Sequence, residues 1–346
     1  MTEPRTVPPA PLLRGGPRTA PAPATARGRR RAPLAALASR LTERDAWLLE
    51  MLAEHTVLTT AHITALWHTG QRSANRRLLA LHRLGLLDSF RPRLQRGAAP
   101  EHYLLARTAA DLLSARYATT PAALGWSSEL VTRTAYSPLL AHNLGVATFF
   151  TDLATTDPEL GRASAWWSEQ RCQQLWGDLV RPDAYGSHTR PDGTGAVGFF
   201  LEYDTGTESH ARLARKLAEY AEAASATRIR PLILFNLHSH RREQNLHHTL
   251  ATHPTLASVN VATTSRDHTA PGQNEHHPAQ AVWLPLGRPA ARTRLLDLPG
   301  LWPGDQQPTG DVEQAAAWTR SAAMPAPDPR GPHTPTPFAP ARLPRA

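Results

Sequence analysis

The first part of the chain carries apolar side chains at helical spacing, followed by two short apolar runs. Apolar residues three and four apart predict helices over residues 43–55, 60–69, 71–84 and 109–117. Thr42 is a good N-cap for the first helix, and Thr59 or Thr60 for the second. The apolar runs 86–90 and 101–105 flank a polar stretch, and this pattern predicts a β-hairpin after the third helix.

The second part of the chain mixes longer apolar segments with turns. Helices are predicted over residues 137–156 and 209–224, and strands over 165–172, 179–184, 196–203, 231–237, 258–262 and 281–286. The turn at 189–195 joins two of these strands as a hairpin. The histidine-rich stretch 238–248 follows a strand, and we expect a polar loop there. Helices and strands in this order are typical of an α+β protein with a mixed sheet and helices on its faces.

Prolines concentrate at the two ends of the chain. Of the 32 prolines, eight lie in residues 1–38 and eight in residues 321–346, and the first segment also holds seven arginines against one acid. Segments of this composition bury too little apolar surface to fold. The sequence therefore predicts a disordered basic arm over 1–38 and a disordered proline-rich tail over 300–346. Two folded domains remain between them, over about 40–120 and 130–290.

Several classes of protein are excluded by composition. The single cysteine, Cys172, cannot form an internal disulfide or a cysteine-rich zinc site, and we expect it to pack in the core. No apolar run approaches the roughly 18 residues of a membrane helix, and the N-terminus lacks the apolar segment of a secretory signal. No glycine-rich loop ending in lysine is present, so we expect no nucleotide cofactor of the P-loop type. We therefore expect a cytoplasmic protein with no membrane partner.

Positive charge is concentrated in the N-terminal part of the chain. The formal net charge is +9, and residues 71–107 hold eight arginines against Asp88 and Glu101. A nucleic acid or another polyanion is therefore an expected partner. Three helices followed by a hairpin resemble a winged helix-turn-helix, in which the third helix enters the major groove of DNA and the hairpin touches the backbone.

This resemblance implies that double-stranded DNA is the partner of the N-terminal domain. The expected contacts on the third helix are Gln71, Arg72, Ser73, Asn75, Arg76 and Arg77, and those of the hairpin tip are Arg91, Arg93 and Arg96. The alternative is a winged helix that pairs with protein and whose arginines lie on a solvated face.

Two acidic positions frame the central hairpin of the second part. Asp183 lies on the first arm and Glu202 at the end of the second, with the turn about midway between them. This spacing places both carboxylates near the same end of adjacent strands. Carboxylate oxygens suit a hard cation such as Mg²⁺, which can polarise a phosphodiester and lower the pKa of an attacking water. The sequence therefore indicates a candidate Mg²⁺ site at this end of the hairpin.

The chain holds one lysine, Lys216, among 38 lysines and arginines. A lysine is compact and can lose its proton when desolvated, so it remains where arginine does not serve. On the predicted helix, Lys216 stands three residues after Leu213 and four before Tyr220, beside the stripe that faces the sheet. We therefore expect it to lean toward the two acids.

These residues together resemble the PD-(D/E)XK nuclease superfamily. The match consists of Pro182-Asp183, then Glu202-x-Asp204, then a helix with a lysine. The usual lysine position, two residues after the second acid, is Asp204 here. Some branches of the superfamily carry the lysine on the following helix, where Lys216 stands.

The segment 199–209, with Lys216, Leu217 and Tyr220 after it, is similar to the bacterial plasmid replication-relaxation family, which also carries an N-terminal winged helix. The resemblance implies that Asp183 and Glu202 are metal ligands and that Lys216 orients the water or stabilises charge on the phosphate. Asp204 is then a third ligand or a group behind the ligands.

Three functions stay open from the sequence. The first is a DNA-binding protein of plasmid or mobile-element replication or relaxation that nicks DNA with Mg²⁺. The second is a sequence-specific DNA-binding regulator with a degenerate nuclease fold, in which Lys216 only neutralises Asp183 and Glu202. The third is a scaffold whose proline-rich tails recruit other replication or transfer proteins.

Overall fold

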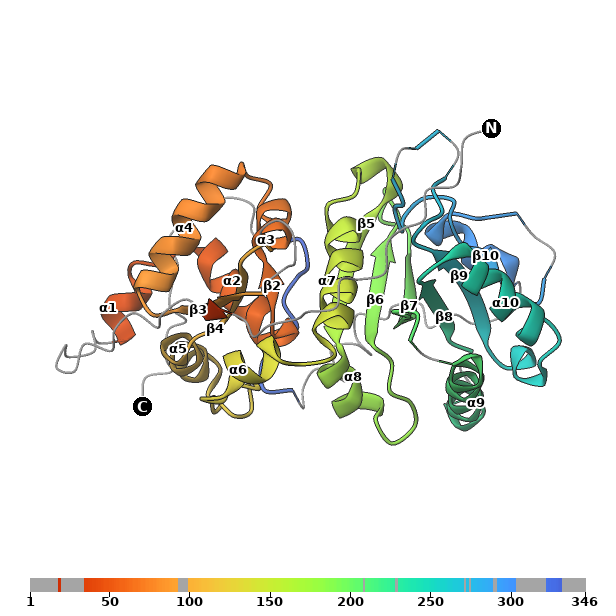
Figure 1. The fold of residues 1–346 in the computed structure, drawn as a ribbon, viewed down its shortest axis with the longest axis horizontal. Coiled ribbons are helices and arrows are strands. Elements are labelled where there is room, and N and C mark those ends of the chain that lie inside the picture. The colour runs from red at the N-terminus through yellow and green to blue at the C-terminus, as the bar shows by residue number, and fades with distance from the viewer. Residues whose placement is uncertain are drawn as a thin grey trace. The chain divides into compact units, whose positions relative to one another are not determined.

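The protein divides into two compact units, which Figure 1 shows as ribbons. The computed structural model describes residues 18–19, 34–92, 99–207, 209–227, 230–270, 272–273, 275–288, 291–302 and 322–331. The N-terminal unit comprises residues 1–147 and 323–346, and the C-terminal unit comprises residues 148–322. Each unit combines helices with a β-sheet, so the predicted α+β class with a mixed sheet is confirmed.

The N-terminal unit is built from short helices and one small antiparallel sheet. Its helices are α1 (Leu34–Ala38), α2 (Glu43–His55), α3 (Thr60–Leu66), α4 (Gln71–Arg83), α5 (Arg107–Tyr117) and α6 (Leu130–Ala135). Its strands are β1 (Arg18–Thr19), β2 (Leu58–Thr59), β3 (Leu87–Arg91) and β4 (His102–Leu105), in the order β1-β3-β4-β2. The predicted helices and the predicted hairpin are present, whereas α6 was not expected, and α1 lies inside the arm that was predicted to be disordered.

Threonine caps define where α2 and α3 begin. The Thr42 hydroxyl accepts a hydrogen bond from the Asp45 backbone N at 3.2 Å, and the Asp45 carboxylate accepts one from the Thr42 backbone N at 2.7 Å. Thr59 and His62 repeat this reciprocal capping box at the start of α3. A capping box satisfies two backbone groups that a helix end would leave unpaired, so both helices start where the sequence indicates. Of the two candidate caps for the second helix, Thr59 is the correct one.

The prediction of disorder is wrong for parts of both ends of the chain. Strand β1, inside the predicted arm, pairs with β3 and places Arg18 opposite Arg91. Residues 322–331, inside the predicted tail, pack on α2, where the Trp47 indole N–H donates to the Asp328 carbonyl at 2.7 Å. Gly331 lies so close to the Trp47 ring that a Cβ would come within 2.3 Å of it. These short segments find a surface of the folded unit, which composition cannot reveal; the rest of both ends lies outside the described residues.

The C-terminal unit is a six-stranded mixed sheet with helices. Its strands are β5 (Arg162–Ser168), β6 (Ala184–Thr189), β7 (Ala196–Tyr203), β8 (Leu232–Leu237), β9 (Asn260–Ser265) and β10 (Leu284–Pro285), in the order β10-β9-β8-β7-β6-β5. Its helices are α7 (Leu140–Ala154, which contains the boundary with the other unit), α8 (Glu169–Trp176), α9 (His210–Thr227) and α10 (His240–Leu250). Strands β7, β8 and β9 run parallel, and the other pairings are antiparallel.

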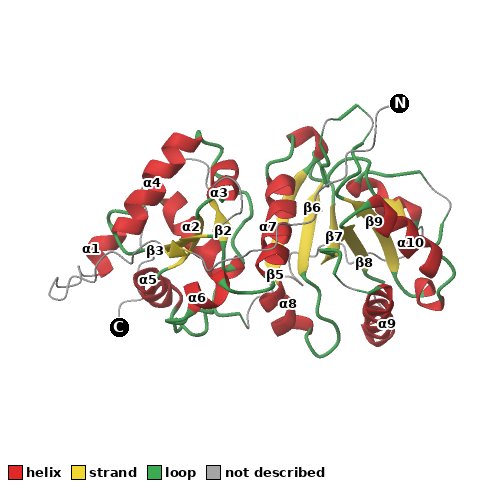
Figure 2. Cartoon of the chain, in the orientation of Figure 1, coloured by secondary structure: helices red, strands yellow, loops and turns green. Residues whose placement is uncertain are grey.

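Apolar side chains cover both faces of this sheet, which Figure 2 shows in yellow among the helices. On one face, Leu213, Leu217 and Tyr220 of α9 pack with Leu246 of α10 against β8 and β9. On the other face, Phe150 of α7 stacks on Trp166 of β5 and on Phe199 of β7. The helices α9 and α10 are the crossovers that parallel strands require, so they cover the same face of the sheet.

Three element predictions are wrong in this unit. The predicted strand 165–172 ends at Ser168, because the Ser168 hydroxyl caps α8 and turns the chain into a helix. The predicted strand 179–184 is displaced toward the turn, since β6 begins at Ala184. The stretch expected to be a polar loop forms α10, a mostly polar helix whose buried residues are Glu243, Leu246 and Leu250. Such a narrow apolar stripe gives a weak periodic signal.

Candidate functional site

Asp183 and Glu202 come together because of the register of the central hairpin. Ala184 of β6 pairs with Leu201 of β7, so the residue before Ala184 stands opposite the residue after Leu201. The Tyr203 backbone N–H donates a hydrogen bond to the Asp183 carboxylate at 2.7 Å. This bond fixes Asp183 at the end of β7, as the spacing of the two acids predicted.

Lys216 reaches both acids from helix α9. Its ammonium group forms a close ion pair with Glu202 and lies 3.6 Å from Asp183 Oδ1. The Tyr220 hydroxyl donates to the other oxygen of Glu202 at 2.7 Å. Lys216 and Tyr220 are one helical turn apart, so a single face of α9 supplies both groups. The structure therefore brings Asp183, Glu202 and Lys216 together at one point.

The buried stripe of α9 sets the position of Lys216. Leu213, Leu217 and Tyr220 are fully buried against the sheet, and Lys216 lies beside them with 18% of its side chain exposed. Lys216 thus extends along the edge of an apolar face toward the sheet, with its head at the acids. Tyr220 is the residue whose polar role the sequence did not reveal; its place four residues after Lys216 was the available signal.

The electrostatics of this cluster are dominated by burial. Glu202 is 2% exposed and Asp183 12% exposed, so Asp183 is the acid that solvent and ligands reach. Burial and the nearby charge of Asp183 raise the pKa of Glu202, and Lys216 and Tyr220 partly oppose this. Burial and the neighbouring Glu202 also raise the pKa of Tyr220, which keeps its hydroxyl protonated as a donor. Two carboxylates share one ammonium group here.

The donor set of the cluster suits Mg²⁺ better than a soft metal. The described residues contain no group of three or more histidine, cysteine, aspartate or glutamate side chains arranged to hold a metal ion. Mg²⁺ is typically held by only one or two carboxylates and keeps several waters. Asp183 and Glu202 meet that requirement, with Asp183 partly open to solvent.

Asp204 does not join the two acids as a ligand in this structure. The guanidinium group of Arg242, on α10, binds both oxygens of the Asp204 carboxylate, one of them at 2.9 Å. Asp204 Oδ1 also accepts the backbone N–H of Gly206 at 3.1 Å, in the turn that leads to α9. Asp204 therefore ties the end of β7 to α10 and shapes the loop before Lys216. No spacing in the sequence indicates Arg242, because α10 itself was not predicted.

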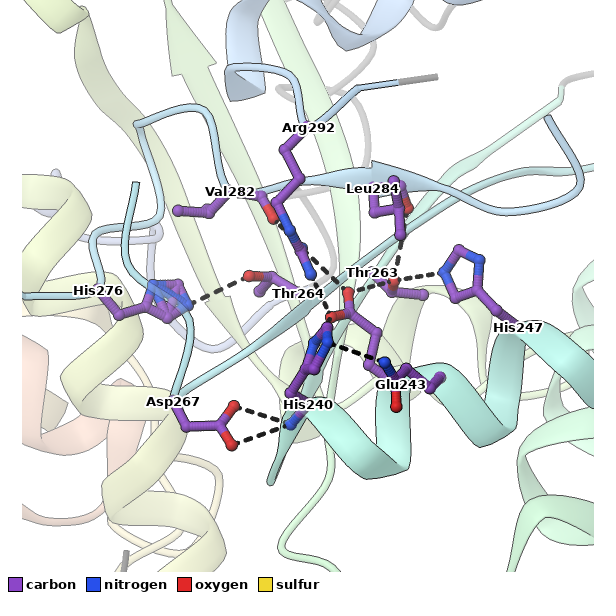
Figure 3. A network of polar contacts seen from close by, with 11 residues as sticks. His240, Glu243, His247, Thr263, Thr264, Asp267, His276, Val282, Leu284 and Arg292 are labelled. Carbon is purple, nitrogen blue, oxygen red and sulfur yellow. Dashed lines mark hydrogen bonds and ion pairs between the residues drawn. The ribbon is translucent and has the colours of Figure 1, made fainter. Parts of the chain in front are cut away.

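A second buried carboxylate, Glu243 of α10, is the centre of a polar network that includes Arg292 and Thr263 (Figure 3). It forms a close ion pair with Arg292, accepts a hydrogen bond from the Thr263 hydroxyl at 2.6 Å, and lies 3.5 Å from His240. Burial alone would raise the pKa of Glu243, but hydrogen bonds from Arg292 and Thr263 lower it overall. This network holds the segment around Arg292 onto α10 and β9, and we assign it a structural role.

The residues expected to contact DNA fall into three groups in the structure. Gln71, Arg72, Asn75 and Arg76 are exposed on one side of α4, opposite the buried Ala74, Leu78 and Leu81, and Ser73 is half-buried. This arrangement leaves one polar face of α4 open to a partner.

Two arginines expected to contact DNA are engaged within the protein. Arg77 turns inward and binds Asp45 of α2, with Nε 2.8 Å from Oδ1. Arg91 lies 3.0 Å from Glu101 across the hairpin, although its side chain stays about half exposed. Arg93 and Arg96 lie outside the described residues. Arg77 therefore has a structural role that its sequence position did not indicate.

Cys172 is buried, as expected. Among the described residues, no helix is both long and apolar enough to span a membrane.

A family model described as replication-relaxation matches residues 49–232, just over half of the chain. The matched region contains α4 and the cluster of Asp183, Glu202 and Lys216, and it ends where β8 begins. No curated protein and no solved structure matches the chain. The chain therefore belongs to the replication-relaxation family, which suggests a role in the replication or relaxation of a plasmid or another mobile element.

Proposed function

We propose that this protein binds duplex DNA through its N-terminal unit and nicks DNA with Mg²⁺ in its C-terminal unit. The observation that carries the proposal is the meeting of Asp183, Glu202 and the single lysine of the chain at one end of the β6–β7 hairpin. Two acids can hold a divalent ion that activates water, and a lysine beside them can stabilise charge on the phosphate, so this group of residues suits phosphodiester cleavage.

The arrangement of the C-terminal unit supports a PD-(D/E)XK-like assignment. Helix α7 precedes the antiparallel strands β5, β6 and β7. Asp183 directly precedes β6, Glu202 lies on β7, and α9 crosses to the parallel strand β8. The lysine comes from α9, as in the branches of the superfamily that lack it on the strand. Asp204, which stands at the usual lysine position, is engaged by Arg242 instead.

The N-terminal unit supports DNA binding through a winged helix-turn-helix. Helices α2, α3 and α4 are followed by the β3–β4 hairpin, which is the order of that motif. Arg72 and Arg76 are exposed on α4, where contact with phosphates needs them.

Each residue of the cluster has a distinct part in the proposed reaction. Asp183 and Glu202 would hold Mg²⁺, which when bound polarises the phosphodiester and lowers the pKa of the attacking water. Lys216 places a positive charge beside the two acids, where it can stabilise negative charge that develops on the phosphate. Tyr220 fixes the rotamer of Glu202 through its hydrogen bond and is a positioning residue.

The test is incubation of the full chain with supercoiled plasmid at low salt, with Mg²⁺ or Mn²⁺. We expect wild type to produce open circles and EDTA to stop the reaction. Asp183→Asn, Glu202→Gln and Lys216→Arg should each lower the rate by roughly 10²-fold or more. Asp192→Asn, at the exposed turn of the same hairpin, is the matched control and should cut like wild type. If the plasmid is bound but never nicked, the nuclease proposal is wrong.

A specific observation favours a second function, a DNA-binding regulator that does not cleave. Lys216 and Tyr220 already satisfy both oxygens of Glu202, which is buried. Such a site could be a stable ion pair within an idle fold. In that case a variant with Asp183, Glu202 and Lys216 all replaced by alanine should bind operator DNA as tightly as wild type. A scaffold would instead keep its function when Arg72 and Arg76 become alanine.

A further inference from the structure

Arg266 stands at the same sheet edge as the acid pair but on the other face. It directly follows β9, and its guanidinium carbon lies 4.4 Å from the centre of the Tyr203 ring. Its Nη1 donates to the Asn236 carbonyl at 3.2 Å, at the end of β8. Because successive residues of a strand point to opposite faces, Glu202 faces α9 while Tyr203 faces Arg266.

The charge of Arg266 has no carboxylate partner within ion-pair distance among the residues that the structure describes. The charges of Asp204 and Asp267 act on it, but the close contacts of both carboxylates are with other groups. Asp204 is bound by Arg242, and Asp267 accepts the backbone N–H of His240 at 2.8 Å and 3.0 Å. Burial lowers the pKa of Arg266, because the charged form loses hydration. A bound anion would stabilise the charged guanidinium group in place of the water that burial removes.

The surroundings of Arg266 include further polar groups. Asn236 is buried and its Oδ1 has no hydrogen-bond partner in the described part of the chain. His276 lies 3.4 Å from the Thr264 hydroxyl, and burial, neighbouring histidines and arginines that include Arg266 lower its pKa to about 4. The imidazole is therefore neutral at physiological pH, so it can donate a hydrogen bond without adding charge.

Three acids oppose the binding of an anion: the charges of Asp204 and Asp267 act on Arg266, and that of Asp152 acts on Tyr203. Asp152 of α7 acts on the Tyr203 ring, and burial and the nearby Glu275 raise the pKa of Asp152 to about 6. Its charge is mostly present at neutral pH, so it weakens the attraction of an anion to this face. Asp152 forms no ion pair with Arg266 within the described residues. Its removal should therefore strengthen the binding of an anion, whereas removal of Arg266 should weaken it.

A direct link joins Arg266 to the acid pair. Tyr203, which Arg266 covers, is the residue after Glu202, and its backbone N–H holds Asp183. The two sites thus occupy opposite faces of one strand end, at the carboxyl edge of the parallel strands. That edge is where open α/β sheets bind their ligands. A nucleic-acid strand that crosses the edge of the sheet would meet both.

We propose that Arg266, stacked on Tyr203, anchors a backbone phosphate of the nucleic-acid strand that lies at the Asp183–Glu202–Lys216 cluster. This inference rests on the proposed function, because it assigns the C-terminal unit a nucleic-acid strand. The planar guanidinium group presents several N–H donors in one plane and suits phosphate oxygens. Stacking on Tyr203 and the bond to Asn236 hold it in one orientation, so little rotamer freedom is lost on binding.

The test measures binding without cleavage, with the full chain in EDTA. The probe is a labelled single-stranded oligothymidylate of about 12 nucleotides, which the winged-helix surface for duplex DNA is not built to read. Fluorescence anisotropy is recorded at several salt concentrations. We expect Arg266→Gln to bind roughly 5- to 10-fold more weakly. The slope of log affinity against log salt should fall by about 0.7 in magnitude, as for one lost phosphate contact with a single strand.

Control variants separate a phosphate contact from a loss of fold. Arg162→Gln removes an exposed arginine at the opposite end of the sheet, where β5 starts, and should change neither affinity nor slope. Arg266→Lys keeps the charge and should fall between wild type and Arg266→Gln. Asp152→Asn removes one of the opposing acids and should tighten binding. Equal affinity and slope for wild type and Arg266→Gln would overturn the inference.

Cleavage of plasmid in a parallel assay keeps the two proposals apart. If wild type nicks plasmid and Arg266→Gln binds the oligonucleotide unchanged, the proposed nuclease stands and the inference about Arg266 is wrong. If wild type nicks nothing but binding depends on Arg266 as described, the inference stands and the nuclease is wrong.

Discussion

Helices α4 and α9 each turn one cation toward a buried carboxylate, but the two ion pairs differ in charge balance. In the N-terminal unit, Arg77 binds Asp45, which also accepts hydrogen bonds from the Thr42 backbone N and hydroxyl at 2.7 Å each. One cation faces one acid, and every oxygen of the acid is used. In the C-terminal unit, Lys216 faces both Glu202 and Asp183, so the cluster has one negative charge in excess when both acids are ionised.

The difference in charge balance distinguishes a structural ion pair from a candidate binding site. A balanced pair that completes a capping box has no need of a further ligand, and it fixes how α4 packs on α2. In the group of two acids and one lysine, burial and then the charge of the second acid raise the pKa of Glu202, and the excess negative charge favours a second cation. Burial alone does not distinguish the two, since Asp45 and Glu202 are both almost fully buried.

The largest expected effect comes from breaking the balanced pair. Asp45→Ala removes a cap and leaves Arg77, whose side chain is 30% exposed, without its partner, so we expect a loss of about 2–3 kcal/mol in the free energy of unfolding of the N-terminal unit. Glu202→Gln removes the excess charge while Asp183 still faces Lys216, and we expect its effect to stay within about 1 kcal/mol. Urea unfolding of both variants measures this. Equal destabilisation by the two would show that the charge balance is irrelevant.

The pH dependence of the free energy of unfolding tests whether the pKa of Glu202 is raised in the folded protein. The pKa of Glu202 is raised in the folded protein, so the folded state binds more protons than the unfolded state between the two pKa values. The free energy of unfolding must therefore fall as pH rises through that interval, by roughly 1.4 kcal/mol for each unit of difference. We expect Glu202→Gln to remove this part of the curve in unfolding measured from pH 5 to pH 9. Parallel curves for wild type and variant would contradict the assignment.

Addition of Mg²⁺ should distinguish the two units. A cation that binds only the folded C-terminal unit stabilises it by about 1.4 kcal/mol at ten times its dissociation constant. Hydrogen exchange read by mass spectrometry should show slower exchange in β6, β7 and α9 and no change in α2 and α4. EDTA should reverse the effect, and Asp183→Asn should abolish it. Protection that persists in Asp183→Asn would place the cation elsewhere.

The smallest effect on stability is expected for the outward arginines of α4. Arg72→Gln with Arg76→Gln should change the free energy of unfolding by less than about 0.5 kcal/mol, because both side chains are exposed. The same double variant should reduce the salt slope of duplex DNA binding by about 1.8, for two lost phosphate contacts. Arg77→Gln should leave the salt slope of duplex DNA binding unchanged. It should lower the free energy of unfolding at 25 °C by more than the double variant does, because Arg77 binds Asp45. Unchanged duplex binding by the double variant would favour the protein-pairing alternative for this unit.

The sequence revealed most of the elements that have strong periodic patterns. Helices α2, α3, α4, α7 and α9 and the hairpin β3–β4 were predicted, because each has a clear apolar stripe, a cap or a turn. The turn and second strand of the β6–β7 hairpin were predicted too, but its first strand was displaced. Helix α10 was missed because its buried face is narrow and includes a charged residue, Glu243. The start of β6 was misplaced because Val180 is buried in the core without being part of a strand.

The candidate site was predictable to a similar degree. The pairing of Asp183 with Glu202 followed from hairpin spacing, and the position of Lys216 followed from its place beside the apolar stripe. Arg242, Arg266 and Arg292 could not be found this way. Each reaches its partner from a segment distant in sequence, and one arginine in a chain with 37 of them carries no signal of its own.

The sequence by itself determined the α+β class, the caps of the first helices and the three residues of the acid–lysine cluster, because periodicity, capping and hairpin spacing are local properties. Only the tertiary structure decided which charges are balanced. Asp204 has the spacing of a ligand but is bound by Arg242, and Arg77 has the position of a DNA contact but is bound by Asp45. An ion pair forms wherever packing brings opposite charges close together. The separation of two residues along the chain does not predict the distance between their side chains in the fold.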